Sequence, residues 1–280
     1  MTPTIDLPDR AQRAAPALPA PKPQCPAPDR PRGATAHLLG LLGAQSGDEE
    51  REQALAVPLR RLSPRAALFH EGAAAAAMYV VRTGTFKCYR TDADGGEQVL
   101  GFARRGDVLG YGAVNLGRYT SAACALEVSS VGVVPLAELF TWLRRSPMLD
   151  RALHQALSMQ QAGFEDLAGV RAAVPAETRL ARFLLHWSRR MAMSGHSLRQ
   201  LRLCITRRDI GRLLGVAHET VSRAFAALSA RGCIAVKGRT VDIVDAGGLL
   251  LVARAHANAD RSPAQGRSWA APAVIESLNA

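Results

Sequence analysis

Glu219, Ser222 and Arg223 lie close together on a predicted helix, and their side chains are of the kinds that read DNA bases. An arginine guanidinium can donate two parallel hydrogen bonds to O6 and N7 of guanine, and a glutamate carboxylate can accept one from N4 of cytosine. Glu219 and Arg223 are four residues apart, so they share a helix face and could read both bases of one G·C pair. The alternative is an ordinary surface ion pair.

The helix with these residues, HETVSRAFAALSARG (218–232), is the second of a closely spaced pair. The first, TRRDIGRLLGV (206–216), opens with Thr206 and has Asp209 three positions later, which is a capping arrangement. Gly215 allows a tight turn between the helices. Both helices have apolar residues at helical spacing: Ile210, Leu213, Leu214, Val221, Ala224, Phe225 and Leu228. These features predict a helix-turn-helix.

The segment CIAVKGRTVDIVD that follows alternates apolar and polar residues on both sides of a cationic turn. We expect a hairpin, or wing, with Lys237 and Arg239 at its tip. Cations and small polar residues beside a reading helix usually contact phosphates or flanking bases. The candidates for such contacts are Thr206, Arg207, His218, Thr220, Lys237 and Arg239.

The charge distribution favours a polyanionic partner. The chain of 280 residues has a formal net charge of +11. From Ala176 to the end there are 16 Lys and Arg against 7 Asp and Glu, so most of the excess lies in the C-terminal part. A basic domain gains affinity for nucleic acid by releasing counterions from the phosphate backbone, although a solvated basic surface has the same composition. The helix-turn-helix decides in favour of double-stranded DNA.

Several other classes of protein are disfavoured. The motifs that would indicate an enzyme do not stand out: a Ser/His/Asp set, paired carboxylates, a P-loop or an HExxH motif. The sequence has no signal peptide, which would indicate export, and no apolar run of about 20 residues, which would indicate a membrane span. An odd number of scattered cysteines fits neither a disulfide framework nor a zinc site: Cys25, Cys88, Cys124, Cys204 and Cys233. We therefore expect a cytoplasmic protein that makes no contact with a membrane.

The chain divides into five parts, and its fold class is α+β. Residues 1–35, rich in Pro and Ala, predict a disordered tail. Residues 36–146 contain short strand-like runs separated by Gly and Asp turns, which predict an antiparallel β-roll. A long helix is expected at 147–173, a winged helix-turn-helix domain at 174–247 and a C-terminal tail at 248–280, in which GLLLVARAHA could form one more helix.

The long helix has an apolar stripe that could pack within the chain or against a second copy. Leu149, Leu153, Leu157, Phe164 and Leu167 recur at three- and four-residue steps. A helix between two domains has few partners in its own chain, so we expect these five residues to form a homodimer contact.

These motifs, in this order, resemble the CRP/FNR family of bacterial transcription regulators over about Leu59–Leu250. The resemblance rests on TRRDIGRLLGVAHETVSR, the wing IAVKGRTVDIVD, TGTFKCYRTDADGGEQVLGF and PAETRLARFLLHWSRR. It implies a cyclic-nucleotide-binding-type β-roll, a dimerisation helix and a winged helix-turn-helix. The family's E-x-x-S-R recognition motif matches Glu219, Ser222 and Arg223, which implies an inverted TTGAT-like repeat.

The resemblance also suggests how transcription could be activated. DADGGEQ resembles the β-roll loop through which FNR contacts RNA polymerase, so Asp94, Gly95, Gly96 and Glu97 are candidate contact residues. A solvated hairpin tip is the alternative.

The sensor chemistry of the family is not retained. Cys25 is the only cysteine of the N-terminal tail, and Gly132 stands where FNR has its β-roll cysteine, so no iron–sulfur cluster is expected. Tyr111 replaces the ribose-binding Glu, and Leu116–Ser121 lacks the Arg-Ser pair that holds cyclic phosphate, although Arg118 could substitute. Cyclic AMP is therefore not expected either.

The remaining reading is a regulator of the FixK-like branch, without a cofactor. A ligand-gated version that senses a small effector, haem or redox state through the β-roll or Cys204 is the alternative. His37, His70 and His154 are possible haem ligands, but no pattern distinguishes them from surface histidines.

Overall fold

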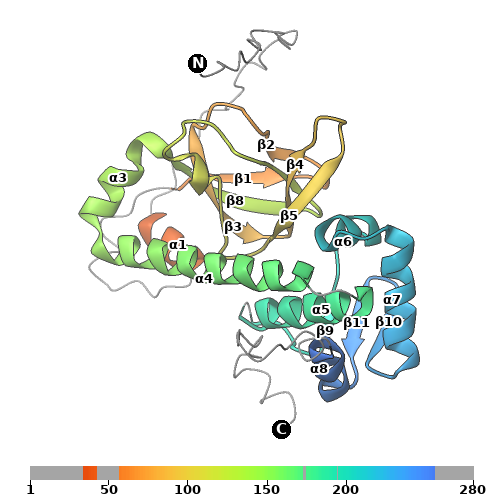
Figure 1. Ribbon diagram of the computed structural model, residues 1–280. Coiled ribbons are helices and arrows are strands. Elements are labelled where there is room, and N and C mark those ends of the chain that lie inside the picture. The colour runs from red at the N-terminus through yellow and green to blue at the C-terminus, as the bar shows by residue number, and fades with distance from the viewer. Residues whose placement is uncertain (1–33, 43–56, 173–174, 194, 256–280) are drawn as a thin grey trace, which may run out of the picture.

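The computed structural model describes residues 34–42, 57–172, 175–193 and 195–255. A β-roll lies above a long helix, and a smaller helical domain lies below it (Figure 1). Most of the predicted tails, 1–33 and 256–280, fall outside the described residues, and so does Cys25.

The β-roll consists of two antiparallel four-stranded sheets, ordered β1-β8-β3-β6 and β2-β7-β4-β5. The strands are β1 (Leu59–Leu62), β2 (Ala67–Phe69), β3 (Ala77–Thr83), β4 (Phe86–Thr91), β5 (Glu97–Ala103), β6 (Val108–Leu109), β7 (Ala122–Ala125) and β8 (Ser129–Pro135). A short 3-10 turn, η1 (Tyr111–Ala113), follows β6. The predicted antiparallel roll is confirmed.

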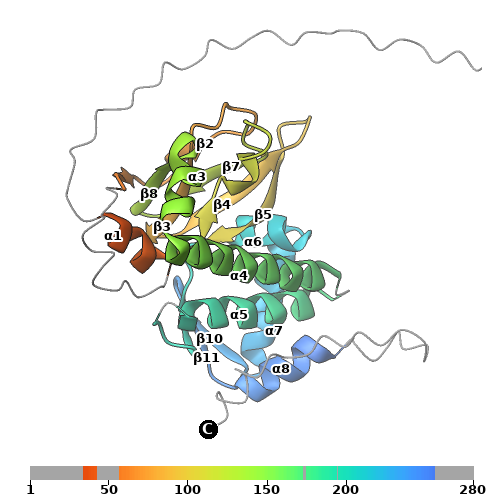
Figure 2. The same cartoon turned by 90° about the vertical axis from the view of Figure 1, so that its left-hand side faces the viewer.

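Among the described residues, three helices border the roll. Helix α1 (Ala34–Leu41) precedes it, and α3 (Leu136–Arg145) and α4 (Pro147–Ala172) follow β8. Helix α4 runs between the roll and the lower domain in both views (Figures 1 and 2). The long helix predicted from the sequence is confirmed.

Leu149, Leu153 and Leu167 of the α4 stripe pack within the chain, which corrects the prediction that all five stripe residues face a second copy. Leu149 and Leu153 are 2% and 1% exposed in a core shared with α1, α3 and the roll. Leu157 is partly buried against the same core, and Leu167 is 9% exposed in the core below. Phe164 is 43% exposed, so its contact with a second copy stays a prediction. The roll and α1 supply the intrachain partners that the linear pattern could not show.

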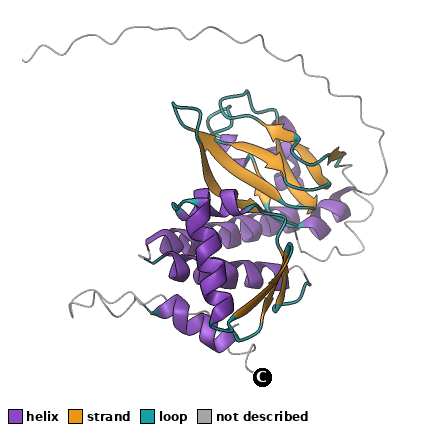
Figure 3. Ribbon diagram, turned by 90° about the vertical axis from the view of Figure 1, so that its right-hand side faces the viewer, coloured by secondary structure: helices purple, strands orange, loops and turns teal. Residues whose placement is uncertain are grey.

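The lower domain contains α5 (Ala176–Met193), β9 (Gln200–Arg202), α6 (Arg207–Leu214), α7 (His218–Ala230), β10 (Ile234–Lys237), β11 (Thr240–Ile243) and α8 (Ala246–Arg254). Figure 3 shows the helices packed beside the small antiparallel sheet, whose order is β10-β11-β9. The predicted winged helix-turn-helix is confirmed.

Helix α8 corrects the domain boundary predicted at residue 247. It begins at Ala246, and the Asp245 side chain caps it by accepting from the backbone N–H of Gly248 at 2.9 Å. Leu249 and Ala253 are fully buried against α5. The buried guanidinium of Arg182 donates to the carbonyl of Ala253 at 2.8 Å. The domain therefore extends at least to Arg254, because its core is incomplete without this helix.

None of the helices within the described ranges is long and apolar enough to cross a membrane.

The Leu153→Ala variant should lower the free energy of unfolding by about 2–5 kcal/mol, since it leaves a cavity in a closed intrachain core. Urea unfolding at several protein concentrations measures this effect. Gln161→Ala, at another exposed position of α4, is the matched control and should change stability by less than about 0.5 kcal/mol. A loss for Leu153→Ala that vanished at high protein concentration would instead place the side chain in a contact between chains.

Candidate nucleic-acid interface

Thr206 caps α6. Its backbone is extended, and its Oγ1 accepts a hydrogen bond from the backbone N–H of Asp209 at 3.1 Å. The same hydroxyl donates to Oδ2 of Asp209 at 2.7 Å. The predicted capping pair is therefore present, and it fixes where α6 begins.

The turn between α6 and α7 depends on two glycines. Gly215 adopts the left-handed conformation (φ 69°) that ends α6, as its position in the sequence suggested. Gly211 lies where a Cβ would be 2.6 Å from the carbonyl oxygen of Val216, so the turn folds directly over it. Sequence reasoning missed Gly211, although a glycine within a helical pattern often marks a close backbone approach.

Helix α7 presents its predicted reading residues to solvent. Glu219, Ser222 and Arg223 are all exposed, while the inward side of the helix is buried against α5 and α6. Glu219 lies 3.2 Å from Nε2 of His218, and Arg223 donates to Oγ1 of Thr220 at 3.3 Å. The described contacts of the two charged residues are thus with neighbours rather than with each other. Both could turn toward a ligand at little cost.

Ser222 and Arg207 make contacts that the sequence did not indicate. The hydroxyl of Ser222 donates to the carbonyl of His218 at 3.0 Å, one helical turn back. The guanidinium carbon of Arg207 lies 3.2 Å from the ring centroid of Phe225, a core residue of α7. Burial lowers the pKa of Arg207 from its usual value. Arg207 therefore joins the two helices by a cation–π contact.

The wing is a tight hairpin. Lys237 pairs with Thr240 across the β10–β11 turn, which contains Gly238 (φ 59°) and Arg239. Both cationic side chains at the tip are exposed. The backbone carbonyl of Arg239 accepts from the N–H of Leu203 at 2.7 Å, which anchors the tip to the segment before α6. The wing tip is therefore tied to the segment that leads into α6.

The structure separates the four residues that are candidates for the contact with RNA polymerase. Asp94, Gly95 and Gly96 lie at an exposed hairpin tip, closed by a 2.8 Å hydrogen bond from the N–H of Asp92 to the carbonyl of Gly96. Glu97 is the first residue of β5, and its carboxylate points to Lys87 and Arg212 in the domain junction. Glu97 therefore does not share the exposed hairpin tip with the other three candidates for the polymerase contact.

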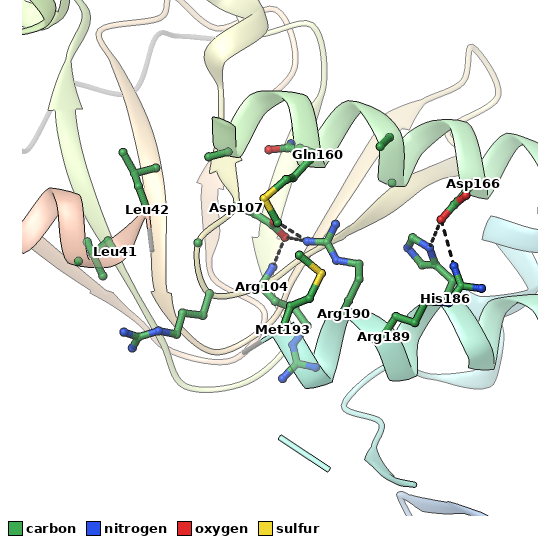
Figure 4. Close-up of a pocket in the computed structure, with 17 residues that line it drawn as sticks. Leu41, Leu42, Arg104, Asp107, Gln160, Asp166, His186, Arg189, Arg190 and Met193 are labelled. Atoms are coloured by element: carbon green, nitrogen blue, oxygen red, sulfur yellow. Dashed lines mark hydrogen bonds and ion pairs between the residues drawn. The ribbon is translucent and has the colours of Figure 1, made fainter. Parts of the chain in front are cut away.

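A hollow of about 420 Å³ lies between α1, the β5–β6 turn, α4 and α5 (Figure 4). Asp107 on the β5–β6 turn pairs with Arg190 on α5. Asp166 on α4 lies 3.5 Å from His186 and 3.6 Å from Arg189, and its hydrogen bond with His186 lowers its pKa. Burial in turn lowers the pKa of His186. The Asp107–Arg190 and Asp166–Arg189 ion pairs, with the hydrogen bond between Asp166 and His186, tie α5 to the β-roll and to α4.

The interior of the β-roll near the expected phosphate position is filled by aromatic side chains. Tyr119, 5% exposed, stacks on Phe69 with ring centroids 4.1 Å apart and donates to the carbonyl of Ala77 at 2.7 Å. Burial raises the pKa of Tyr119 above its usual range. Arg118 is exposed and donates to the carbonyl of Gly72 at 3.2 Å.

The cysteines among the described residues are free thiols. Burial and the neighbouring Glu127 raise the pKa of Cys204 to about 11, and burial raises that of Cys88 to about 12. Both are therefore protonated thiols at neutral pH. A Cβ on Gly132 would lie 3.0 Å from Val57 and 3.2 Å from Leu41, so this position is packed against apolar side chains.

Comparison with known proteins matches both domains. Residues 59–146 fit the cyclic nucleotide-binding domain, and residues 178–251 fit the Crp-like helix-turn-helix domain. The chain is 36% identical over 186 residues to the fumarate and nitrate reduction regulatory protein of Salmonella typhimurium, covering 66% of this chain and 74% of that protein. The chain belongs to the CRP/FNR family of transcription regulators. This family member is therefore a DNA-binding regulator, and its helix-turn-helix is the DNA-binding element.

Other known proteins are also similar to this regulator. The Escherichia coli K12 protein of the same name is 37% identical over 176 residues, covering 63% of this chain and 70% of that protein. The structure of FixK2 from Bradyrhizobium japonicum matches with a TM-score of 0.62 at 28% identity, over 71% of this chain and 98% of that one. A CooA mutant from Carboxydothermus hydrogenoformans matches with a TM-score of 0.60 at 18% identity, over 77% and 95%, which shows the fold alone.

The Thr206→Ala variant should lower the free energy of unfolding by about 0.5–2 kcal/mol, because it removes the cap of α6 and leaves the N–H of Asp209 without its acceptor. Thermal or urea unfolding measures the change. Ser222→Ala is the control, since this hydroxyl is exposed and bonds only to a carbonyl of its own helix, and it should change stability by less than about 0.5 kcal/mol. Equal stability of Thr206→Ala and wild type would rule out the capping role.

Proposed function

We propose that this regulator binds an inverted repeat of TTGAT-like half-sites, with Glu219, Ser222 and Arg223 reading base edges in the major groove. The exposure of these three residues on α7 carries the proposal. Arg223 offers its fork to a guanine, and Glu219 accepts from the cytosine amino group. The hydrogen bond of Ser222 to its own helix leaves its lone pairs outward.

The flanking residues have separate roles in this proposal. Lys237 and Arg239 contact phosphates from the exposed wing tip, and the exposed His218 and Thr206 contact the backbone at the starts of the two helices. Thr220 supports Arg223, to which its hydroxyl is hydrogen-bonded. Arg207 acts indirectly, because its guanidinium lies over Phe225 and steadies the angle between α6 and α7.

We also propose that the protein is a homodimer, because an inverted repeat requires two reading helices related by a two-fold axis. The contact lies on the exposed side of α4, opposite the stripe that packs on the roll. Gln155, Met159 and Ala162 follow one another there at helical spacing and are exposed, Met159 by 50%. Met159 and Ala162 also line one wall of the hollow, together with Leu42 and Met193. A second α4 would cover this partly apolar wall.

Contact with RNA polymerase through the exposed tip Asp94–Gly96 is the proposed route to activation. The tip projects from the roll and is free of described contacts with the DNA-binding domain. Glu97 is left out of this contact because its carboxylate faces the junction.

We propose that the regulator acts in the cytoplasm, without an iron–sulfur cluster or cyclic AMP and without catalytic activity. The aromatic filling around Tyr119 and the bond of Arg118 to Gly72 support the absence of a cyclic-phosphate site. The apolar packing at Gly132 supports the absence of a cluster ligand. The raised pKa of Cys204 disfavours the redox alternative, since a protonated thiol is a poor nucleophile. His70 and His154 are exposed, and the side chain of His37 lies outside the described residues.

The test is binding of the full-length protein to a duplex with an inverted TTGAT repeat, in air, with and without cyclic AMP and reductant. We expect binding that none of the additions changes. Arg223→Ala should weaken it by about 1–3 kcal/mol, roughly 5- to 150-fold, and should relax the preference for the half-site guanine.

The matched control is Arg145→Ala, which removes one exposed cation at the end of α3. It should change the affinity little, since Arg145 lies outside the DNA-binding domain. Strict dependence on one addition would identify a sensor. An unchanged binding isotherm for Arg223→Ala would overturn the base-reading assignment.

Ala162→Arg should convert the dimer to a monomer, because two large cations would meet near the two-fold axis. Light scattering after size-exclusion chromatography measures the mass. Gln161→Arg, about 100° further round the helix, is the control and should stay dimeric. A monomeric wild type, or a dimeric Ala162→Arg, would refute this interface.

A further inference from the structure

Lys87 of the β-roll is almost completely buried against the DNA-binding domain. It is 8% exposed, and its Nζ lies 2.7 Å from Oε2 of Glu97 on β5 and 3.3 Å from Oδ1 of Asp209 on α6. Burial alone would lower the pKa of Lys87, but the hydrogen bond with Glu97 and the charge of Asp209 outweigh it and raise the pKa. A buried ammonium that stays charged requires both carboxylates in place.

Arg212 completes the cluster from the side of α6. Its guanidinium pairs with the same oxygen of Glu97 that Lys87 contacts. Lys87, Glu97, Asp209 and Arg212, which we call the junction cluster, thus hold two positive and two negative charges. The charges balance, and each domain contributes one of each sign. The arrangement is therefore complementary only when the two domains are in this orientation.

The cluster acts on the first helix of the DNA-binding motif. Asp209 is also the residue whose backbone and carboxylate bond to the capping Thr206. Helix α6 shares its apolar face with α7, through Ile210, Leu213, Val221 and Phe225. Holding α6 therefore holds the reading helix, because a packed core transmits a rigid displacement.

Two further contacts run in parallel with the cluster. Arg171 at the end of α4 donates to the carbonyl of Leu213 at 2.8 Å and to that of Val99 on β5 at 2.7 Å. Glu127 of the roll accepts from Oγ1 of Thr85 at 2.8 Å and from Sγ of Cys204 at 3.0 Å. These contacts fix the same relative orientation of the domains.

We propose that Lys87 and Glu97 are positioning residues for DNA binding: through Asp209 and Arg212 they hold α6, and with it α7, in the orientation that engages DNA. Glu219, Ser222 and Arg223 stay exposed in this orientation, so the cluster does not mask the reading face. Because the cluster already orders the two domains in the free protein, DNA binding does not have to order them. A chain without the cluster binds DNA more weakly, in proportion to the fraction of molecules whose domains remain in this orientation.

Glu97→Gln tests the proposal because two physical effects predict opposite changes in the affinity for DNA. Removing a negative charge from a DNA-binding protein should by itself strengthen binding. The proposal predicts weaker binding, by roughly tenfold, because the ordered fraction falls. The salt dependence should keep its slope, since Glu97 touches no phosphate. Glu138→Gln, an exposed carboxylate on α3, is the charge-matched control and should bind as well as wild type or slightly better.

A double-mutant cycle with Arg212→Gln shows whether the two residues act through each other. The double variant should bind about as weakly as Glu97→Gln alone, because both substitutions break one link. Additive losses would mean that Arg212 contacts DNA directly and that Glu97 acts elsewhere. Unchanged or tighter binding by Glu97→Gln would overturn the proposal.

A measurement without DNA separates this proposal from the half-site assignment, since it rests on DNA binding but not on the sequence bound. Hydrogen exchange of the free full-length protein should become faster in α6 and at the start of β5 in Glu97→Gln, and not in Glu138→Gln. If wild type shows no preference for the TTGAT repeat, the half-site proposal fails, and affinities for a scrambled duplex at low salt still test the cluster. Unchanged hydrogen exchange in α6 of Glu97→Gln would count against the junction-cluster proposal in either case.

Discussion

The two domains of this regulator share one hydrophobic core, and the rest of the structure depends on it. Phe102 of β5 packs edge-on against Phe183 and Trp187 of α5, with centroids 6.4 and 6.0 Å away. Val99 of the same strand is fully buried in this core. Each buried aromatic or aliphatic side chain contributes about 1.5–3 kcal/mol. The roll and the DNA-binding domain are thus joined by packing before any polar contact is considered.

Polar contacts around that core define the relative orientation of the domains, which apolar packing alone leaves less specific. They include the junction cluster and the Asp107–Arg190 and Asp166–Arg189 ion pairs. Buried charges are costly unless each is paired, so an incorrect orientation would leave several without a partner. A junction of this kind suits the ligand-independent DNA binding that we propose.

The fold could be predicted from the sequence to a large extent because its signals are local. The Thr206–Asp209 cap and the glycine turn depend on residues a few positions apart. The predicted exposure of Glu219 and Arg223 followed from helical periodicity and agrees with the structure. The α4 stripe was recognised as apolar, but its partner was assigned to a second chain, since periodicity gives the face of a helix and not what covers it.

The sequence by itself determined the order of the domains, the helix-turn-helix and the residue types on the exposed face of α7, because each is encoded within one element or its neighbours. Only the tertiary structure decided what Glu97 and Leu153 do. Glu97 reads as part of a loop, yet it meets Arg212, 115 residues away, and Leu153 meets the roll instead of a second helix. Such contacts depend on how separately encoded elements pack, and no local spacing specifies that packing.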